Sequence, residues 1–309
     1  MNQKRKIINY HEASLGQLDA GTIIRYPNPK NGENNADYYY AVPSFLIIGA
    51  MKCGASELTA WLLKHHSLSG LAREWHFFDE VSDIQQEWKR YVISPHFMVQ
   101  DKKIHTANMQ LHTFEKTTEY FDKANRGTLV PEVIQKMMPS GKFIVLLRNP
   151  TDRVYSHYKM NQRPKKIRAP LTGYKTSHFG ELIQDYFEKG EDSQYARDFR
   201  IGHYAEHLSH WLNYFSREQL LILFIDDFKK HPFDVMKKVQ DFLGLKYFDY
   251  SSITEKTSQG LWVLKSRPTQ NHYHNNEPMC ALDRQLLNDY YEPWNKRLKQ
   301  MFPELAFSW

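Results

Sequence analysis

The chain has 309 residues, of which 41% are hydrophobic, and a formal net charge of +6. This composition supports a substantial buried core and excludes an intrinsically disordered protein. The positive charge favours an anionic ligand, but the sequence has no basic helix, zinc finger or RNA-binding aromatic motif, so we expect no nucleic-acid partner. Cys53 and Cys280 are the two cysteines, which makes a disulfide framework unexpected.

The N-terminal region carries no recognisable targeting segment. Its basic start is not followed by an apolar stretch, and no window approaches the roughly 18 apolar residues that span a membrane. We therefore expect a cytoplasmic protein without a membrane span. Residues 1–42 are polar and include the Pro-, Asn- and Gly-rich stretch RYPNPKNGENN, which predicts an irregular N-terminal arm. Residues 43–309 are predicted to form a single domain.

From residue 43 onward, buried strands alternate with amphipathic helices. This alternation predicts an α/β fold of three layers, with a central parallel sheet covered on both faces. The helix after the second strand is expected to be capped by Thr151 or Asp152, and the last helix of the series to end at Gly244. The predicted strands are 45–50, 142–149 and 219–228, and the predicted helices are 56–66, 151–162, 203–215 and 233–245.

The stretch FLIIGAMKCGASEL, residues 45–58, has the pattern of a phosphate-binding turn between a strand and a helix. Lys52 precedes Gly54, whereas nucleotide triphosphatases have Gly-Lys-Ser/Thr. The second strand ends in Arg148, where those enzymes place an Asp that holds Mg²⁺, and Ser156 follows eight residues later. The pattern indicates a ligand with two anionic groups and no dedicated metal. A kinase or GTPase-like P-loop protein is the alternative of another class.

Seven stretches resemble one enzyme family in the same order. The chain resembles the sulfotransferases that use 3′-phosphoadenosine 5′-phosphosulfate (PAPS), and it is most similar to their heparan-sulfate-type branch. The resemblance implies a P-loop-like fold, PAPS as donor and 3′-phosphoadenosine 5′-phosphate (PAP) as product, and it extends from residue 43 to the C-terminus. The stretches are KCGASEL, REWHFFD, FEKTTEYF, LRNPTDRVYSHY, IGHYAEHLSHWLNYF, VQDFLGL and YEPWNKRL.

The resemblance also implies roles for particular residues. Glu74 is the expected general base, and its aromatic neighbours predict a raised pKa. His76 is expected to orient this base or to contact the sulfuryl group, and Lys52 and Lys116 to stabilise the developing charge. The implied cofactor-binding residues are Lys52, Cys53, Gly54, Ala55, Ser56, Glu57, Arg148, Ser156, Lys265, Ser266 and Arg267. The implied acceptor-binding residues are Trp75, Asp79, Lys165 and Lys166.

The chain departs from the family pattern in three places. Ala55 stands where the phosphosulfate loop usually has Thr, and Thr118 and Glu119 stand where Pro and a small residue are usual. The C-terminal cofactor loop, represented here by LWVLKSRP, lacks the cysteine pair of Golgi relatives. The second departure leaves the contacts of Lys116 open.

Three histidines raise the question of a metal. His203, His207 and His210 have spacings of four and three residues, which zinc sites also use. No Glu stands directly after the first of them, where zinc metalloproteases of the His-Glu-x-x-His type have their general base, and the resembled family needs no metal, so we predict no metal site. The thiol of Cys53 is predicted to pack rather than to react.

The acceptor is the part of the function that the sequence determines least. We expect transfer to a hydroxyl or an amine or amide nitrogen of a small molecule, such as a polar alkaloid toxin or a glycolipid. We expect the basic loop at 161–175 to border the acceptor cleft. A glycan O-sulfotransferase is the alternative within the family, and a non-catalytic binding protein with the same fold is a further one. The oligomeric state stays open.

Overall fold

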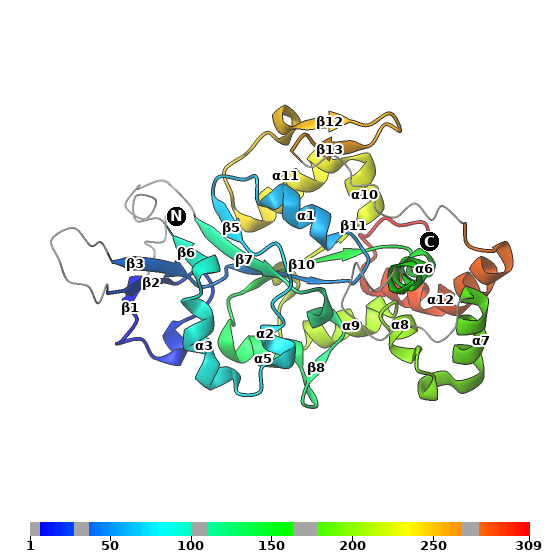
Figure 1. Ribbon diagram of the computed structural model, residues 1–309, viewed down its shortest axis with the longest axis horizontal. Coiled ribbons are helices and arrows are strands. Elements are labelled where there is room, and N and C mark those ends of the chain that lie inside the picture. The colour runs from blue at the N-terminus through cyan, green and yellow to red at the C-terminus, as the bar shows by residue number, and fades with distance from the viewer. Residues whose placement is uncertain (1–6, 28–36, 100–110, 163–177, 267–277) are drawn as a thin grey trace.

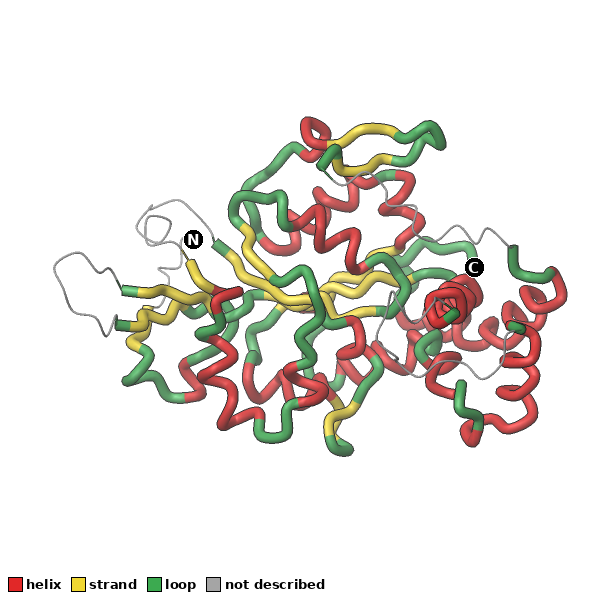
Figure 2. The backbone as a smooth tube through the Cα atoms, in the orientation of Figure 1, coloured by secondary structure: helices red, strands yellow, loops and turns green. Residues whose placement is uncertain are grey.

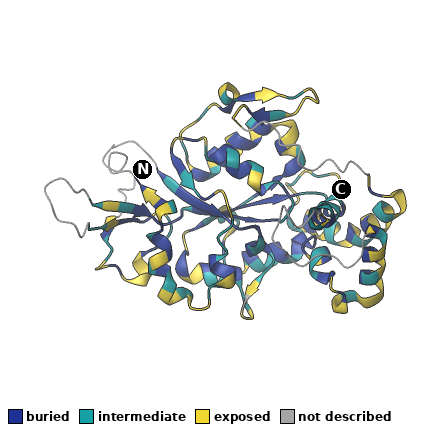
Figure 3. Ribbon diagram, in the orientation of Figure 1, coloured by how far each residue is buried: buried dark blue, intermediate teal, exposed yellow. Residues whose placement is uncertain are grey.

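The computed structural model describes residues 7–27, 37–99, 111–162, 178–266 and 278–309. Its centre is a parallel five-stranded sheet in the order β11-β10-β4-β7-β5. β4 is wholly buried, and β10 is buried apart from its first residue, as strands covered on both faces must be (Figure 3). The strands are β4 (Phe45–Gly49), β5 (Leu68–Gly70), β7 (His112–Lys116), β10 (Lys142–Leu147) and β11 (Leu220–Phe224).

Helices cover both faces of this sheet, which confirms the predicted three-layer α/β fold (Figure 1). One face carries α1 (Ala55–Leu62), α10 (Ile225–Lys230) and α11 (Pro232–Leu243). The other face carries α2 (Phe77–Glu80), α3 (Ile84–Val92), α5 (Val130–Met137) and α9 (Tyr204–Leu212).

A group of helices lies beyond the β11 end of the sheet and has its own hydrophobic cluster (Figure 2). The long helix α12 packs against α6, α7 and α9. No helix within the described ranges has the length and apolar character needed to cross a membrane. The group comprises α6 (Pro150–Asn161), α7 (Phe179–Lys189), α8 (Ala196–Arg200) and α12 (Ala281–Met301).

The predicted strands and helices of the domain are present, with corrections to one strand and one helix cap. The predicted strand 219–228 ends at Phe224, because the residues after it form α10. The side chain of Asn149, not of Thr151 or Asp152, caps α6 by accepting a hydrogen bond from the Thr151 amide at 2.9 Å. Pro150 occupies the first helical position, where a missing N–H costs nothing, and this places the cap one residue earlier. α11 ends at Gly244 as predicted, in the left-handed conformation with φ 71°.

The prediction that residues 1–42 form an irregular arm is wrong for the part that the structure describes. This part contributes three strands to a four-stranded sheet in the order β1-β2-β3-β6, and its side chains join the main core. Thr113 of β7 donates a hydrogen bond to the Ala41 carbonyl at 2.7 Å and ties the small sheet to the large one. The strands are β1 (Ile7–Asn9), β2 (Ile23–Tyr26), β3 (Tyr38–Ala41) and β6 (Met98–Val99).

Two short hairpins complete the described structure. β8 (Ala124–Asn125) pairs with β9 (Thr128–Leu129), and β12 (Thr254–Lys256) pairs with β13 (Trp262–Leu264). The second hairpin follows α11 and lies on the outer side of the helical layer formed by α1, α10 and α11 (Figure 1).

Candidate active site

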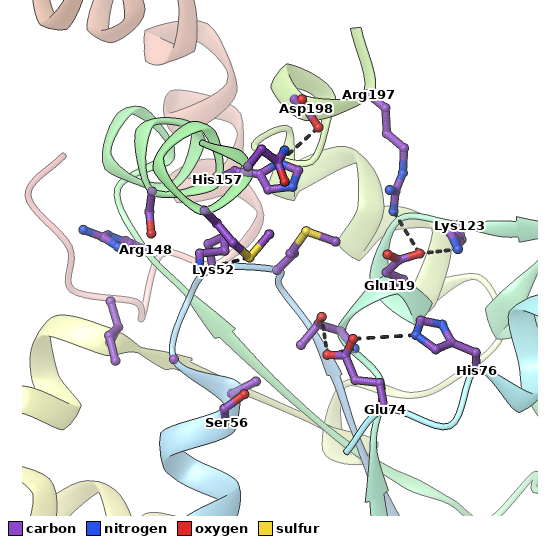
Figure 4. A pocket seen from close by; sticks show the side chains of 18 of the residues that line it. Lys52, Ser56, Glu74, His76, Glu119, Lys123, Arg148, His157, Arg197 and Asp198 are labelled. Atoms are coloured by element: carbon purple, nitrogen blue, oxygen red, sulfur yellow. Dashed lines mark hydrogen bonds and ion pairs between the residues drawn. The ribbon is translucent and has the colours of Figure 1, made fainter. Parts of the chain in front are cut away.

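A cavity of about 670 Å³ opens where β4, β7 and β10 end. Because the strands are parallel, their carboxyl ends meet at one edge of the sheet, and the loops that follow them surround the cavity. Figure 4 shows Lys52 and Arg148 at one end and Glu74 and His76 at the other. We call these the anion end and the acceptor end.

The predicted phosphosulfate loop lines the anion end with Lys52, Gly54, Ala55 and Ser56. Gly54 has φ 98°, and an added Cβ would lie 2.3 Å from Cδ1 of Ile225, so both the conformation and the space require glycine. Lys52 also has a positive φ of 69°, an uncommon conformation for a residue with a side chain. The N-terminus of α1 follows directly and favours a negative charge.

Two predicted members of this loop do not line the cavity. Cys53 is fully buried, its Sγ lies 3.6 Å from the Tyr204 hydroxyl, and burial raises the pKa of its thiol. The Glu57 carboxylate accepts a hydrogen bond from Trp61 Nε1 at 3.0 Å. The predicted packing role of Cys53 fits this position. The cofactor-binding assignment of Cys53 and Glu57 stays a prediction, and the two side chains contact other parts of the protein.

Arg148 and Ser156 both line the anion end, on the loop after β10 and on α6. The Tyr204 hydroxyl donates a hydrogen bond to the Arg148 carbonyl at 2.8 Å and fixes the backbone there. Lys229 of α10 adds a third cation, which sequence reasoning missed. Burial lowers the pKa of Lys229, and the nearby charge of Arg148 lowers it further. Lys229 belongs to the helix after β11 and to no recognised motif. Its place at the cavity is therefore evident only from the three-dimensional fold.

Glu74 is held by groups from the segment after β7. Its Oε1 accepts hydrogen bonds from Thr118 Oγ1 at 2.8 Å and Lys116 Nζ at 3.1 Å. Burial alone would raise the pKa of Glu74, but the charge of Lys116 and these hydrogen bonds outweigh it and hold the pKa below its ordinary value. The prediction of a raised pKa is therefore wrong, because the aromatic neighbours in the sequence do not reveal this cation.

His76 lies between two carboxylates at the acceptor end. Its Nδ1 is 3.0 Å from Asp79 Oδ2, and its Nε2 is 3.7 Å from Glu74 Oε2. The hydrogen bond with Asp79 raises the pKa of His76, although burial opposes it. The Asp79 side chain is fully buried and also contacts Lys123 Nζ at 3.1 Å. Asp79 therefore orients His76 and does not face the cavity, which leaves it no part in acceptor binding.

Lys116 connects the two ends of the site. Its Nζ lies 3.1 Å from the Glu74 carboxylate and 3.5 Å from the Ser56 hydroxyl. The unusual Thr118 leaves these contacts in place and adds its own hydrogen bond to Glu74.

Some predicted residues lie away from the cavity or outside the described structure. Trp75 stacks on Phe97, with ring centroids 5.6 Å apart, and does not line the cavity. Lys265 Nζ donates to the Ser252 carbonyl at 2.9 Å beside the β12–β13 hairpin, and neither it nor Ser266 lines the cavity. These three assignments stay predictions, and the described structure places the residues away from the cavity lining. Lys165, Lys166 and Arg267 lie outside the described residues.

Sequence reasoning also missed most of the other charged groups that line the cavity. Lys123 pairs with Glu119, and Arg197 pairs with the buried Asp122 at 2.9 Å and with Glu119 at 3.6 Å. His157 Nδ1 lies 3.0 Å from Asp198 Oδ1. These residues lie on α6, α8 and the segment around β8, and no single sequence motif contains them. The residues of this set that line the cavity are Glu119, Lys123, His157, Arg197 and Asp198.

Potential metal ligands converge at one place in the described part of the chain. Ligand atoms of His76, Asp79 and Glu119 lie within 4.8 Å of one another. The ammonium group of Lys123 pairs with both carboxylates and thus holds a positive charge in this position.

The histidine stripe noted in the sequence is engaged in other contacts. Nε2 of His203 lies 2.7 Å from the Tyr290 hydroxyl, and Nε2 of His207 lies 2.8 Å from the Arg200 carbonyl. Burial lowers the pKa of His203 to about 3 and that of His207 to about 4. Both histidines therefore pack as neutral core residues.

Comparisons with known proteins identify the family. A model of the sulfotransferase domain matches residues 43–292. Human heparan sulfate glucosamine 3-O-sulfotransferase 6 is 30% identical over 282 residues, which cover 86% of this chain and 73% of that protein. Mouse bifunctional heparan sulfate N-deacetylase/N-sulfotransferase 4 is 29% identical over 283 residues, which cover 86% of this chain and 30% of that protein.

Among solved structures, a sulfotransferase from Alicyclobacillus acidocaldarius aligns with a TM-score of 0.57 at 21% identity, covering 84% of this chain and 96% of that one. This likeness supports the fold. Together with the family match, it confirms the P-loop-like fold that the sequence resemblance implies. The chain therefore belongs to the sulfotransferase family and is a PAPS-dependent sulfotransferase.

Proposed function

We propose that this enzyme transfers the sulfuryl group of PAPS to a hydroxyl or to an amine or amide nitrogen of a small molecule, with Glu74 as the general base. One observation carries the proposal: Lys116 contacts both the base and the phosphosulfate loop, at 3.1 and 3.5 Å. The acceptor atom must contact the base and the sulfuryl group at the same time. Lys116 contacts both the base and the loop that is expected to hold the donor, and it therefore places the two next to each other.

The residues at the anion end fit a donor with two separated anionic groups. Lys52 and Ser56 are placed to hold the 5′-phosphosulfate at the N-terminus of α1, and Arg148 and Ser156 to hold the 3′-phosphate. PAPS supplies an activated sulfuryl group. The acceptor atom forms a bond to sulfur while the bond from sulfur to the bridging oxygen breaks, and PAP leaves with that electron pair. Lys52 stabilises the negative charge that develops on the bridging oxygen.

The charge states at neutral pH favour Glu74 over His76 as the base. The lowered pKa of Glu74 keeps its carboxylate ionised, whereas the raised pKa of His76 favours the protonated ring. A carboxylate accepts a proton from the acceptor, and a protonated imidazole donates hydrogen bonds. His76 is therefore placed to stabilise charge on the Glu74 carboxylate or on the sulfuryl oxygens.

The charges at the acceptor end favour a small acceptor that is neutral or cationic. Three carboxylates among the described residues line this end: Glu74, Glu80 and Glu119. The groups at this end that carry or can carry a positive charge, Lys123, Arg197 and the His76 ring, are each paired with a carboxylate in the described structure. A polyanionic chain would meet repulsion here, since like charges brought together are unfavourable.

The glycan alternative rests on the relatives, whose names state heparan sulfate as their substrate. The carboxylates at the acceptor end argue against assigning heparan sulfate to this enzyme as its substrate, because heparan sulfate is itself a polyanion. The kinase or GTPase alternative is disfavoured because β10 is followed by Arg148 rather than by an acidic residue.

An acceptor panel tests the proposal directly. The enzyme is incubated with PAPS and with neutral, cationic and sulfated candidate acceptors, and mass spectrometry follows the gain of one sulfuryl group. The proposal expects transfer to small neutral or cationic acceptors. Transfer confined to sulfated oligosaccharides would support the glycan alternative, and ATP turnover dependent on Mg²⁺ would overturn the assignment.

A further inference from the structure

The segment from Glu115 to Tyr120 makes hydrogen bonds that hold the residues of the acceptor end in place. It comprises the end of β7 and the start of the short helix η3 (Thr118–Phe121). Lys116 and Thr118 bind the Glu74 carboxylate. Thr117 Oγ1 accepts hydrogen bonds, at 3.1 and 3.3 Å, from the two amides that follow Glu74 in the chain.

A buried pair from the same segment supports α2. Glu115 and Tyr120 have no exposed surface, and the Tyr120 hydroxyl donates to Glu115 Oε1 at 2.7 Å. The same hydroxyl oxygen accepts hydrogen bonds from the amides of Phe77 at 3.0 Å and Phe78 at 3.3 Å. These are the first two amides of α2, and the first amides of a helix have no partner within the helix.

Glu115 determines which way the tyrosine proton points. A hydroxyl has one proton and two lone pairs. While the proton of Tyr120 points at Glu115, both lone pairs are available to the amides of α2. Without an acceptor at position 115, either the buried hydroxyl proton stays unpaired, or it turns toward those amides and one of them loses its partner inside the core. An unpaired buried amide costs about 1–3 kcal/mol.

α2 carries the groups whose geometry matters for transfer. His76 precedes its first residue in the left-handed conformation, with φ 62°, and Asp79 lies in its first turn. The His76 amide is held by Thr117, so a shift of the first turn of α2 moves Asp79 relative to His76 and changes their 3.0 Å contact. We propose that Glu115 is a positioning residue, which acts through Tyr120 to hold His76 and Asp79 in the arrangement used for sulfuryl transfer. This inference rests on the roles proposed above for the acceptor end.

The surroundings of Glu115 agree with this role. Burial raises the pKa of Glu115 to about 7; the hydrogen bond from Tyr120 lowers it, and the charge of Asp79 raises it. The carbonyl oxygen of a carboxyl group accepts a hydrogen bond in either protonation state. The proposed role therefore requires an acceptor oxygen at position 115 and not a charge.

This requirement sets the choice of variants. Glu115→Met removes the acceptor, Glu115→Gln keeps an acceptor oxygen, and Tyr120→Phe removes the hydroxyl. Tyr250→Phe is the matched control, because its hydroxyl is also buried but has no hydrogen-bond partner within the described residues. Three quantities are measured: kcat for sulfuryl transfer, the Kd of PAP by calorimetry, and the pKa of His76 by NMR titration. Charged groups that face His76 and enter its titration are Glu74, Asp79, Glu80 and Glu119.

We expect Glu115→Met and Tyr120→Phe to lower kcat by roughly 10- to 100-fold, the range for misplaced catalytic groups. The Kd of PAP should stay within about twofold of the wild-type value, because no cofactor contact is removed. The pKa of His76 should fall toward its ordinary 6.5 as the Asp79 contact loosens. Glu115→Gln and Tyr250→Phe should resemble the wild type in all three.

Two results would overturn the inference. One is a Tyr120→Phe variant that matches Tyr250→Phe in both kcat and the pKa of His76. The other is a Glu115→Gln variant that loses as much as Glu115→Met, since an acceptor oxygen would then not be what matters. The NMR titration needs no turnover, so it still decides the inference if the wild type transfers no sulfuryl group. That last result would instead overturn the proposed function.

Discussion

At the scale of single residues, the site depends on the opposite charges of two neighbouring side chains. Glu74 and His76 approach to 3.7 Å, and contacts to other residues move the pKa of Glu74 down and that of His76 up. Lys116 and Thr118 lower the first, and Asp79 raises the second. The result is a carboxylate held in its ionised form beside an imidazole whose protonated form is favoured.

Replacing Lys116 tests the cause of the lowered Glu74 pKa. A base must be deprotonated, so kcat/KM falls on the acid side as pH drops through the pKa of Glu74 in the free enzyme. In the wild type this limb lies below the ordinary value of 4.5. Lys116→Met removes the opposing charge, burial then raises the pKa, and the limb moves to higher pH. The pH profile of kcat/KM measures the shift, and an unmoved limb would contradict the role of Lys116.

The matched control for that variant is Lys136→Met. Lys136 is an exposed lysine on α5 that also pairs with a glutamate, Glu132, at 2.7 Å. Its removal eliminates one positive charge far from the cavity and should leave the acid limb where it is.

The 3′-phosphate assignment of Arg148 and Ser156 is tested by ligand-induced stabilisation. A ligand that binds only the folded state raises the Tm as its concentration rises. PAP should raise the Tm of the wild type much more than adenosine 5′-phosphosulfate, which lacks the 3′-phosphate. Arg148→Ala and Ser156→Ala should remove this difference. Equal shifts from both nucleotides in the wild type would refute the assignment.

At the scale of elements, the sharpest requirement lies in the turn from β4 to α1. Gly54 combines a left-handed backbone with a contact that leaves no room for a side chain, because Ile225 of α10 lies against it. The turn thus depends on a residue that comes from another part of the chain and that also lines the cavity.

Gly54→Ala should therefore lower both stability and PAP affinity. The left-handed conformation alone costs about 1–2 kcal/mol for a residue with a Cβ. Gly260→Ala provides the control, because Gly260 also has a positive φ, of 78°, but nothing lies within 4 Å of its added Cβ. Chemical denaturation and calorimetry with PAP should show a larger loss of stability for Gly54→Ala and a loss of affinity only there. Equal losses in both variants would show that the contact with Ile225 is unimportant.

The sequence predicts elements well where burial is continuous and poorly where it is not. β4, β10 and β11 are apolar throughout and are predicted, whereas β1, β2 and β3 have three or four residues each and escape a search for periodicity. The partner of β3 at the far edge, β6, lies more than 50 residues later in the chain. The pairing of β1, β2, β3 and β6 into one sheet is therefore evident only from the structure.

The same limit applies to the site. Motifs identify Lys52, Glu74, His76 and Arg148, because each belongs to a local pattern. The pKa of Glu74 depends on Lys116, which is 42 residues away in the chain. The residues near Glu74 in the sequence therefore do not predict whether its pKa is raised or lowered. Arg197 and Lys229 reach the cavity only through the packing of α8 and α10.

At the scale of the whole molecule, the parallel sheet brings the anion end and the acceptor end to one edge. β4 leads to the loop with Lys52, β10 to Arg148, and β7 to the segment that holds Glu74. The positive charge needed for transfer comes from Lys52, Lys116 and Arg148. A separate cation is therefore not required by the proposed chemistry.

Chelation tests that expectation. Turnover in EDTA should equal turnover in untreated buffer, and added Mg²⁺ or Zn²⁺ should not increase it. Loss of activity in EDTA that Zn²⁺ or Mg²⁺ restores would contradict the mechanism and direct attention to His76, Asp79 and Glu119.

The most direct test of the account is Glu74→Gln, compared with His76→Ala in single-turnover assays and in PAP calorimetry. The amide keeps the shape of the side chain and its hydrogen bonding but is not basic enough to take the acceptor proton. The account predicts that turnover falls by roughly 10²- to 10⁴-fold, the span of general-base catalysis, while the Kd of PAP changes little. A Glu74→Gln enzyme with nearly wild-type turnover, beside an inactive His76→Ala enzyme, would show that the base is His76 and that the roles proposed for the two residues are reversed.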